Sequence, residues 1–306
     1  MLDYKLLEAL GAVVDQAGFE RGAQALGLTQ SAVSQRIKLL ESRLGQPVLV
    51  RAPRIAPTEL GRRLLNHIQQ VRLLEHDLLD YVPALGEREH RLRIALNADS
   101  LDTWWCEAIA DFDTGQPLLF DLVVEDQETA LTRMRDGEVA ACLCATPRSV
   151  QGARARPLGG MRYLPVATPG FLERHFPGGI TPDALTEAPG VVFGSDDRLH
   201  QRYIAHHGVT APFPHHLCPS SEGFHRMIRA GLGYGLVPEL QCHDALERGE
   251  LSLLEHDTNI VVPLYWHYWR QGGQVLEALN EHLTRVARHW LTDLSESERH
   301  EPVPPT

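Results

Sequence analysis

Long apolar runs are missing from this chain of 306 residues, including at its N-terminus. No stretch approaches the length of about 20 apolar residues that a helix needs to cross a bilayer. Asp3, Lys5 and Glu8 interrupt any apolar run at the start of the chain. We therefore expect a cytoplasmic protein without membrane contact. Its length allows two or three domains with a sizeable core.

Cysteine is scarce, and the five cysteines are scattered and odd in number. A disulfide framework needs regularly spaced pairs, so we interpret them as buried thiols in a reducing cytoplasm. Two of them, Cys142 and Cys144, would share one face of a strand, too close to bridge comfortably. The five are Cys106, Cys142, Cys144, Cys218 and Cys242.

Motifs of catalysis and metal binding are also missing. The chain has no GxSxG, P-loop, HExxH or CxxC pattern and no paired-carboxylate motif. Its histidine pairs, His206-His207 and His215-His216, are adjacent in sequence, and neighbouring residues do not share a helical face. The run AGLGYG predicts a tight turn into a buried strand rather than a nucleotide-binding loop. The sequence therefore predicts no enzyme, no metal and no cofactor.

Charge is distributed unevenly along the chain, whose net charge is −11. Residues 1–65 contain nine Lys/Arg and six Asp/Glu, a balance of +3, which leaves −14 for the remainder. A mildly basic N-terminal module is thus joined to an acidic body. The acidity of the body suits a cationic ligand, although a solvated acidic surface gives the same count.

Residues 19–45 read FERGAQALGLTQSAVSQRIKLLESRLG and predict a helix-turn-helix. Apolar residues recur at helical spacing, Gly27 interrupts the pattern, and Thr29 follows as an N-cap for a second helix over about 30–43. That helix carries no carboxylate before Glu41, so nothing acidic would repel phosphate along most of its outer face. An amphipathic helical hairpin with a polar surface is the alternative.

The segment after this helix predicts a wing. Residues 48–50 and 55–56 suit two short strands, with a tip at residues 51–54 between them. Gln and Ser side chains can bond base edges, whereas Arg and Lys hold phosphates, so we expect helix and wing to contact DNA together. The expected DNA-binding residues are Thr29, Gln30, Ser31, Ser34, Gln35, Arg36, Lys38, Arg51 and Arg54.

A long helix is predicted from Glu59 to about Val82, with Thr58 as its N-cap. Its apolar residues are spaced alternately by about three and four, which is typical of a coiled-coil seam. A lone helix of this length needs a partner, so we expect the same helix of a second subunit to pair with it. The seam comprises Leu60, Leu64, Ile68, Val71, Leu74 or Glu75, and Leu78.

From Leu92 onward, short apolar strands alternate with helices, which predicts an α/β body with mainly parallel sheets. The predicted strands are 92–97, 120–126, 140–146, 163–168, 190–194 and 260–269. Helices are expected to begin near Ser100, Gln127, Pro169, Asp196, Ser221 and Gly273.

These residues resemble a known family. The run TQSAVSQRIKLLESRLGQPVLVR, followed by PTELG and a long helix, is similar to the LysR-type transcriptional regulators. Gly22-Ala23 stands where many members have paired alanines, a minor departure. In the body, NADSLDTWW, RYLPVATPGFLERHFP and SSEGFHRMIRAGLGYGLVPELQ resemble the ArgP/LysG branch, whose members sense lysine or arginine. The resemblance covers nearly the whole chain.

The resemblance implies a fold that is α+β overall. It implies two Rossmann-like subdomains, similar to periplasmic binding proteins, with a small effector (L-lysine or L-arginine) in the cleft. It also implies promoter DNA, a second copy of the chain in a dimer or tetramer, and RNA polymerase as partners. The implied parts are a winged helix-turn-helix (1–58), a linker helix and hinge (59–90), and an effector domain (91–306) with subdomain I (91–162 and 269–306) and subdomain II (163–268).

Candidate effector residues lie at strand ends and helix starts, where α/β proteins bind ligands. A helix N-terminus offers free N–H groups to an amino-acid carboxylate, and acidic side chains suit its cationic groups. Acidic residues also favour helix N-termini without any ligand, which is the alternative for each of them. The candidates are Asp99, Ser100, Thr103, Trp104, Glu125, Asp126, Thr146, Asp196, Ser221 and Glu222.

The sequence thus predicts a DNA-binding regulator that senses lysine or arginine and controls basic amino-acid export or metabolism. A solute-binding or sensor protein for another small molecule, without those target genes, is the main alternative, since the α/β body alone would serve. The DNA-reading module and the missing signal segment argue against it. A cytosolic enzyme is a third possibility, for which no catalytic constellation is present.

Overall fold

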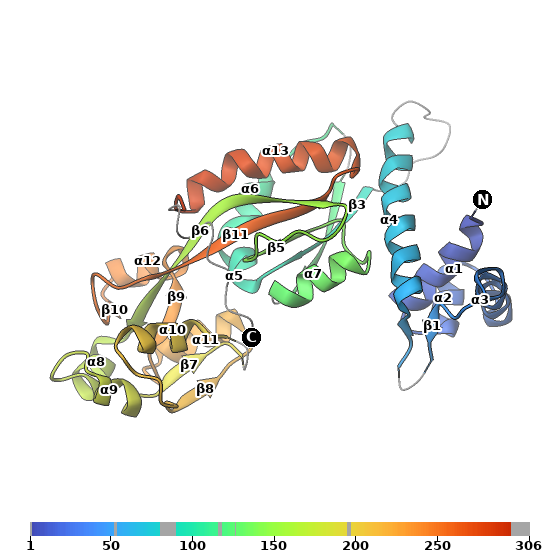
Figure 1. Ribbon diagram of the computed structural model, residues 1–306. Helices are drawn as coiled ribbons and strands as arrows, with labels where there is room; N and C mark the ends of the chain where they lie inside the picture. Colours follow the sequence, from blue (N-terminus) through green and yellow to red (C-terminus); the bar gives the residue numbers. More distant parts are fainter. Residues whose placement is uncertain are drawn as a thin grey trace.

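The computed structural model describes residues 2–51, 54–79, 90–115, 118–125, 127–194 and 197–294, with residues 72–79, 90, 127 and 128 described as backbone only. A small helical head and a larger α/β body are joined by one long helix (Figure 1). Within the described residues, no helix combines the length and apolar character of a membrane span.

The head is a helix-turn-helix with a two-stranded wing, as the sequence predicts. Thr29 caps the recognition helix, because its Oγ1 accepts a hydrogen bond from the backbone N–H of Ala32 (3.2 Å). Gly45 ends that helix in the left-handed conformation at φ 71°. The elements are α1 (Tyr4–Asp15), α2 (Phe19–Ala25), α3 (Gln30–Leu44), β1 (Leu49–Val50) and β2 (Ala56–Pro57).

Gly22 explains the departure from paired alanines in α2. A Cβ atom at this position would lie 2.9 Å from the carbonyl oxygen of Ala12, because α1 and α2 cross there in close contact. The glycine therefore allows the two helices to approach.

The linker helix α4 (Glu59–Leu79) packs against its own head. Thr58 caps it by accepting a hydrogen bond from the N–H of Gly61 (3.1 Å). Leu64, Leu65 and Ile68 are buried among the apolar residues of the head. The first turns of the predicted coiled-coil seam thus contribute to the core of one protomer. From residue 72 onward, the seam lies outside the residues whose side chains are described.

The body is built on a mixed seven-stranded sheet, so the expectation of mainly parallel sheets is wrong. The strand order is β10-β6-β11-β5-β3-β4, with β9 paired to β6. Only β3–β4 and β3–β5 are parallel pairs in this sheet. The strands are β3 (His90–Leu96), β4 (Leu118–Val124), β5 (Ala141–Cys144), β6 (Ala153–Ala167), β9 (Gly235–Pro238), β10 (Ser252–Leu253) and β11 (Ile260–Trp269).

The antiparallel pairing comes from two long strands, β6 and β11, which run side by side through the whole body (Figure 1). Their register extends from Ile260 opposite Tyr163 to Trp269 opposite Ala153, with a shift between Leu264 and Tyr265. The subdomain boundaries expected at residues 162/163 and 268/269 lie within β6 and β11. Sequence patterning located only the last third of β6, because Arg154 and Arg156 break the apolar run near its start.

Helices cover the sheet, and α13 and α7 lie on opposite faces (Figure 1). We use subdomain I for the part with β3–β5, α7, α13 and the helical segment at residues 98–110. That segment comprises α5 (Ala98–Ser100), a π-helical turn (Leu101–Trp105) and α6 (Cys106–Ala110). The other two helices are α7 (Gln127–Arg135) and α13 (Gly273–Trp290).

Subdomain II is the part with five short helices and a small parallel pair of strands, β7 and β8. The helix expected near Asp196 begins at Leu199 instead. The elements are α8 (Pro169–His175), α9 (Pro182–Glu187), β7 (Gly190–Val192), α10 (Leu199–His206), β8 (His215–Leu217), α11 (Ser221–Arg229) and α12 (Glu239–Glu247).

Three of the five cysteines, Cys142, Cys144 and Cys242, are buried thiols as expected. The expectation is wrong for Cys106, which is exposed, and for Cys218, which is half-buried. Cys106 begins α6, and the number and spacing of the cysteines, on which the prediction rested, carry no information about the burial of one side chain.

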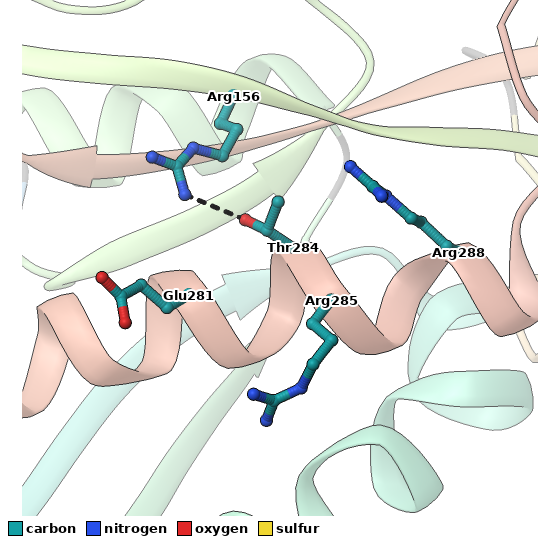
Figure 2. Close-up of a pocket in the computed structure, with 5 residues that line it drawn as sticks. All are labelled: Arg156, Glu281, Thr284, Arg285 and Arg288. Carbon is teal, nitrogen blue, oxygen red and sulfur yellow. Dashed lines mark hydrogen bonds between the residues drawn. The ribbon is translucent and has the colours of Figure 1, made fainter.

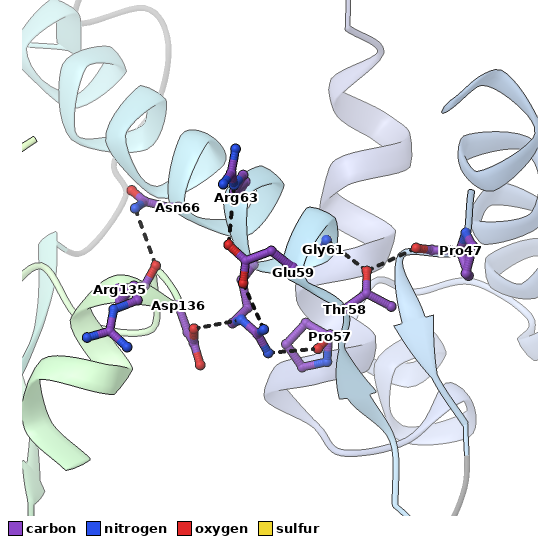
Figure 3. A network of polar contacts seen from close by, with 10 residues as sticks. Pro47, Pro57, Thr58, Glu59, Gly61, Arg63, Asn66, Arg135 and Asp136 are labelled. Carbon is purple, nitrogen blue, oxygen red and sulfur yellow. Dashed lines mark hydrogen bonds and ion pairs between the residues drawn. The ribbon is translucent and has the colours of Figure 1, made fainter. Parts of the chain in front are cut away.

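The linker helix also contacts subdomain I, at the turn after α7 (Figure 3). Arg62 forms an ion pair with Asp136 (Nε–Oδ1 3.2 Å), and the Asn66 side chain donates to the carbonyl oxygen of Arg135 (3.4 Å). Gly137 follows at φ 75°, and a Cβ atom there would lie 2.4 Å from the Cα of Asn66. Head and body are therefore in direct contact within one protomer.

Candidate functional site: a DNA-reading face and an acidic cluster

A hollow of about 340 Å³ opens on the recognition face of the head. Gln30, Ser31 and Ser34 of α3 line it together with Arg51 of the wing. These are four of the residues that the sequence assigns to DNA. Amide and hydroxyl groups for base edges and a guanidinium for phosphate thus lie on one surface.

Arg51 is held in place from two sides. Its Nη2 is 3.2 Å from Oε2 of Glu41, and its guanidinium lies 5.6 Å from the ring centre of Phe19. The side chain nevertheless remains 48% exposed. Phe19 also lines the hollow, and our sequence reasoning missed it. The available signal was an aromatic residue at the start of α2, beside the recognition helix.

The remaining predicted DNA-binding residues divide into two groups. Thr29 serves as the helix cap and lies 3.0 Å from the hydroxyl of Ser31, and Arg36 points toward α1, where it donates to the Lys5 carbonyl (3.5 Å). The other three are exposed: Gln35, Lys38 and Arg54. Residues 52 and 53 of the predicted wing tip lie outside the described residues.

In the body, the predicted residue Asp99 forms a buried acidic cluster with Tyr163 and Asp197. The Tyr163 hydroxyl donates to Oδ2 of Asp99 (2.6 Å). The pKa of Asp99 is raised to about 6, mainly by burial; the hydrogen bond from Tyr163 opposes this rise, and the nearby carboxylate of Asp197 contributes to it. Burial and the same two carboxylates raise the pKa of Tyr163 well above its usual value. We call these three residues the Asp99 cluster.

The cluster joins elements from both subdomains. Asp99 begins the helical segment of subdomain I, Tyr163 lies on β6, and Asp197 precedes α10 of subdomain II. Backbone N–H groups fix the Asp197 carboxylate: Leu199 donates to Oδ1 (2.9 Å) and Phe193 to Oδ2 (3.3 Å).

The sequence prediction named Asp196 for this position, but Asp196 lies outside the described residues. Within the described part of the chain, its neighbour Asp197 is the subdomain II carboxylate that acts on Asp99. Tyr163 was missed as well, because on the apolar strand 163–168 it reads as an ordinary core residue. Its hydroxyl gains a role only through the fold.

Ser100, beside Asp99, is fully buried, yet its hydroxyl has no hydrogen-bond partner among the described residues. The same holds for Oδ1 of Asn97, the residue before the helical segment. Buried polar atoms are rarely left unpaired, so this end of the segment has capacity for a polar ligand. The π-helical turn that follows is a feature often found at functional sites.

Most of the other predicted effector residues have structural partners. Thr103 donates to the carbonyl of Asp99 (2.5 Å). Trp104 is fully buried in the core, and its indole N–H has no hydrogen-bond partner among the described residues. Glu125 binds Arg133 (2.6 Å), and Glu222 forms an ion pair with Arg226 (2.6 Å) on the exposed face of α11. These acids stabilise their own elements, which is the alternative weighed above.

For the last three predicted effector residues, the structure gives fewer contacts that bear on ligand binding. Ser221 is buried and accepts a hydrogen bond from Gln241 (3.3 Å). Thr146, at the end of β5, accepts through its carbonyl from His267 (2.8 Å) and keeps a half-buried side chain. Asp126 lies outside the described residues.

Two family models match the chain. The model for the bacterial regulatory helix-turn-helix protein, lysR family, matches residues 4–62. The model for the LysR substrate binding domain matches residues 85–290. Together they cover the head, the first four residues of the linker helix and nearly all of the body.

Curated relatives and solved structures agree with these matches. The HTH-type transcriptional regulator ArgP of Pseudomonas fluorescens (strain Pf0-1) is 62% identical over 96% of this chain and its own full length. ArgP of Pseudomonas aeruginosa (strain UCBPP-PA14) is 60% identical over 96% of this chain and 99% of that protein.

Among solved structures, ArgP from Mycobacterium tuberculosis has a TM-score of 0.85 at 34% identity and covers 96% of this chain and 100% of its own. Full-length LysG from Corynebacterium glutamicum with bound effector Arg has a TM-score of 0.75 at 31% identity and covers 95% and 100%. The chain belongs to the LysR family of transcriptional regulators, in its ArgP branch.

Proposed function

We propose that this regulator senses arginine or lysine and controls genes for the export or metabolism of basic amino acids. The observation that carries the proposal is the Asp99 cluster, which places two carboxylates and a tyrosine hydroxyl where the subdomains meet. A guanidinium or ammonium group is the natural counter-charge for two neighbouring, partly buried carboxylates. The arginine bound to LysG of Corynebacterium glutamicum supports the same ligand class.

The two ends of a basic amino acid find different partners in this arrangement. A cationic group binds Asp99 and Asp197, while the ligand carboxylate accepts from the Ser100 hydroxyl and the first N–H groups of the helical segment. Because the carboxylates come from different subdomains, the ligand draws these subdomains together. It therefore favours one arrangement of the body over others, which is a population shift.

The output is DNA binding by the head. α3 enters the major groove, Gln30 and Ser34 contact base edges, and Arg51 holds phosphate. A dimer or tetramer presents several such heads to promoter DNA, and the spacing of the heads decides how RNA polymerase gains access. The contact between α4 and the turn after α7 is the route from body to head within a protomer.

Calorimetric titration of the full-length protein tests this proposal. Arginine and lysine should bind, whereas citrulline and norleucine, which have similar shapes without the side-chain charge, should bind at least tenfold more weakly. The Asp197→Asn variant should lose this preference for the cation. Equal binding of arginine and citrulline would refute the role of the Asp99 cluster and favour a sensor for another small molecule.

A gel shift with the promoter of a neighbouring exporter gene tests the DNA end separately. We expect specific binding whose affinity or footprint changes with arginine or lysine. Absence of binding at moderate salt, with and without either amino acid, would contradict the proposed target genes while leaving the calorimetric result intact.

A further inference from the structure

A second hollow lies on the outside of subdomain I, between β6 and α13, away from the Asp99 cluster and the DNA-reading face. It has a volume of about 290 Å³. Figure 2 shows its five lining residues, one from the strand and four from successive turns of the helix. They are Arg156, Glu281, Thr284, Arg285 and Arg288.

Arg156 is held rigidly at the strand side of this hollow. Its Nη1 donates to Oγ1 of Thr284 (3.0 Å), and its guanidinium lies 5.8 Å from the ring centre of Tyr268. The Thr284 hydroxyl is oriented in turn, since it donates to the carbonyl of Asn280 (2.6 Å). Arg156 is half-buried, and one hydrogen bond leaves most of its N–H donors available.

Arg285 is oriented by a second short chain of hydrogen bonds. Nε2 of the buried His282 lies 2.7 Å from the carbonyl oxygen of Ala108, so this nitrogen carries the proton and donates. Nδ1 of the same ring is then an acceptor for Nη2 of Arg285 (3.0 Å). A neutral histidine thus positions a guanidinium without neutralising its charge.

None of the three arginines has a carboxylate within ion-pair distance among the described residues. Some other arginines of the body have such partners: Arg133 contacts Glu125 and Glu138, and Arg229 contacts Glu250. The chain as a whole is acidic, with a net charge of −11. Three guanidinium groups and one carboxylate, that of Glu281, thus line this hollow, which leaves an excess of positive charge there.

We propose that this hollow binds a small multivalent anion through phosphoryl groups. Guanidinium groups match phosphoryl oxygens in a two-pronged geometry, and several of them around one anion suit a charge above one. The volume accommodates a small molecule, and two of the three cations are oriented before any ligand arrives. Glu281 is the single acidic lining residue, and it weakens the binding of any anion.

Inorganic pyrophosphate is the probe for this site. We expect saturable binding to the full-length protein in calorimetry at constant ionic strength, together with a rise in melting temperature. Arg288→Ala should weaken binding about tenfold, because it removes a charge-assisted hydrogen bond. Glu281→Gln should strengthen binding severalfold. Arg154→Ala removes an exposed arginine of the same strand that does not line the hollow, so it should change affinity less than twofold.

Parallel titrations with a nucleoside diphosphate show what carries the phosphoryl groups. Affinity equal to that of pyrophosphate identifies the phosphoryl groups as the whole ligand, and tighter binding shows that the hollow also holds the nucleoside. No saturable binding of pyrophosphate at millimolar concentration would overturn the proposal. Equal losses in the Arg288→Ala and Arg154→Ala variants would do so as well, because they would show attraction by general charge only.

Discussion

At the scale of single residues, Asp99 works against the stability of the fold. Its pKa is raised from 3.8 to about 6, so the folded protein holds this proton more readily than the unfolded chain. The ionised carboxylate therefore costs stability once the pH exceeds the unfolded value, and the cost is full above about 6. In the proposed function, the cationic group of the ligand supplies the missing counter-charge.

The Asp99→Asn variant should be more stable than the unchanged protein and should bind arginine more weakly. An asparagine keeps an acceptor for the Tyr163 hydroxyl but removes the buried charge, so the free energy of unfolding at neutral pH should rise by about 1–2 kcal/mol. Its affinity for arginine should fall at least tenfold. Denaturant unfolding and calorimetry measure the two effects. A variant that lost stability and kept arginine affinity would place the ligand elsewhere.

The affinity for arginine should also depend on pH. A bound cation favours the ionised form of Asp99, so affinity should be constant above about pH 6 and should fall below it, by at most about tenfold per pH unit. Calorimetry across this range measures the profile. In the Asp99→Asn variant the profile should be flat, and an unchanged slope in that variant would assign the titration to another group.

On the DNA-reading face, substitutions of Ser34 and Arg51 should affect DNA binding in different ways. Ser34→Ala should weaken binding to the operator by about 1 kcal/mol and leave random DNA unaffected. Arg51→Ala should weaken binding to both and reduce the slope of log affinity against log salt by about one. Titrations at several salt concentrations separate the two effects. Arg174→Ala, an exposed arginine of α8, is the control, and an effect as large as that of Arg51→Ala would refute this assignment.

At the scale of elements, the contact between α4 and the turn after α7 joins sensor and head. Arg62 connects them: it pairs with Glu59 on its own helix (2.8 Å) and with Asp136 of the body (3.2 Å). Burial raises the pKa of Asp136, with the charge of Arg62 opposing this shift. Figure 3 shows these polar groups between helix and turn. A movement of subdomain I therefore displaces the base of α4.

Gly137→Ala should disconnect the two parts. An added methyl group would clash with the backbone of Asn66 at 2.4 Å and would strain a residue at φ 75°. We expect arginine and DNA each to bind with near-normal affinity, while arginine no longer changes DNA binding. Gel shifts with and without arginine measure the coupling.

Gly249→Ala is the matched control for this experiment. Gly249 has φ 69°, and an added Cβ there meets no atom within 4 Å, so it carries the same backbone strain without the clash. Coupling should persist in this variant. Loss of coupling in both variants would trace the effect to general destabilisation rather than to the contact with α4.

At the scale of the whole molecule, assembly should depend on the far end of α4. Leu64 and Ile68 are occupied by the core of the head, so the predicted seam beyond residue 72 remains for a second subunit. We expect sedimentation of the full-length protein as a dimer or tetramer, and smaller species for a Leu74→Glu, Leu78→Glu double variant. Unchanged sedimentation of this variant would move the interface away from the helix.

Much of the architecture was predictable, because short-range signals decide it. Caps at Thr29 and Thr58 and the apolar run at 260–269 fix their elements locally, and the structure has them where the sequence placed them. The mixed sheet was not predictable in the same way. Parallel or antiparallel pairing depends on partners far apart in the chain, and the apolar pattern of a buried strand is the same in either case.

The candidate site shows the same division. Asp99 was identified from its place at a strand end, but Tyr163 and Asp197 joined it only through tertiary packing. Glu125 and Glu222 had equally good positions in the sequence, yet Arg133 binds the first and Arg226 binds the second. Local pattern marks where a carboxylate can serve a ligand, and the surrounding charges decide whether it does.

The long pair of strands, β6 and β11, also determines the order in which the protein is completed during synthesis. The head contains every strand and helix it needs once α4 has left the ribosome. Synthesis of subdomain I begins soon afterwards, but two of its elements come much later in the chain. These are β11, which lies between β5 and β6 in the sheet, and α13, and both are missing until residues 260–290 have been made. Subdomain II, inserted between the two strands, emerges in the meantime. A nascent chain therefore carries a finished DNA-reading head well before its effector-binding body is complete.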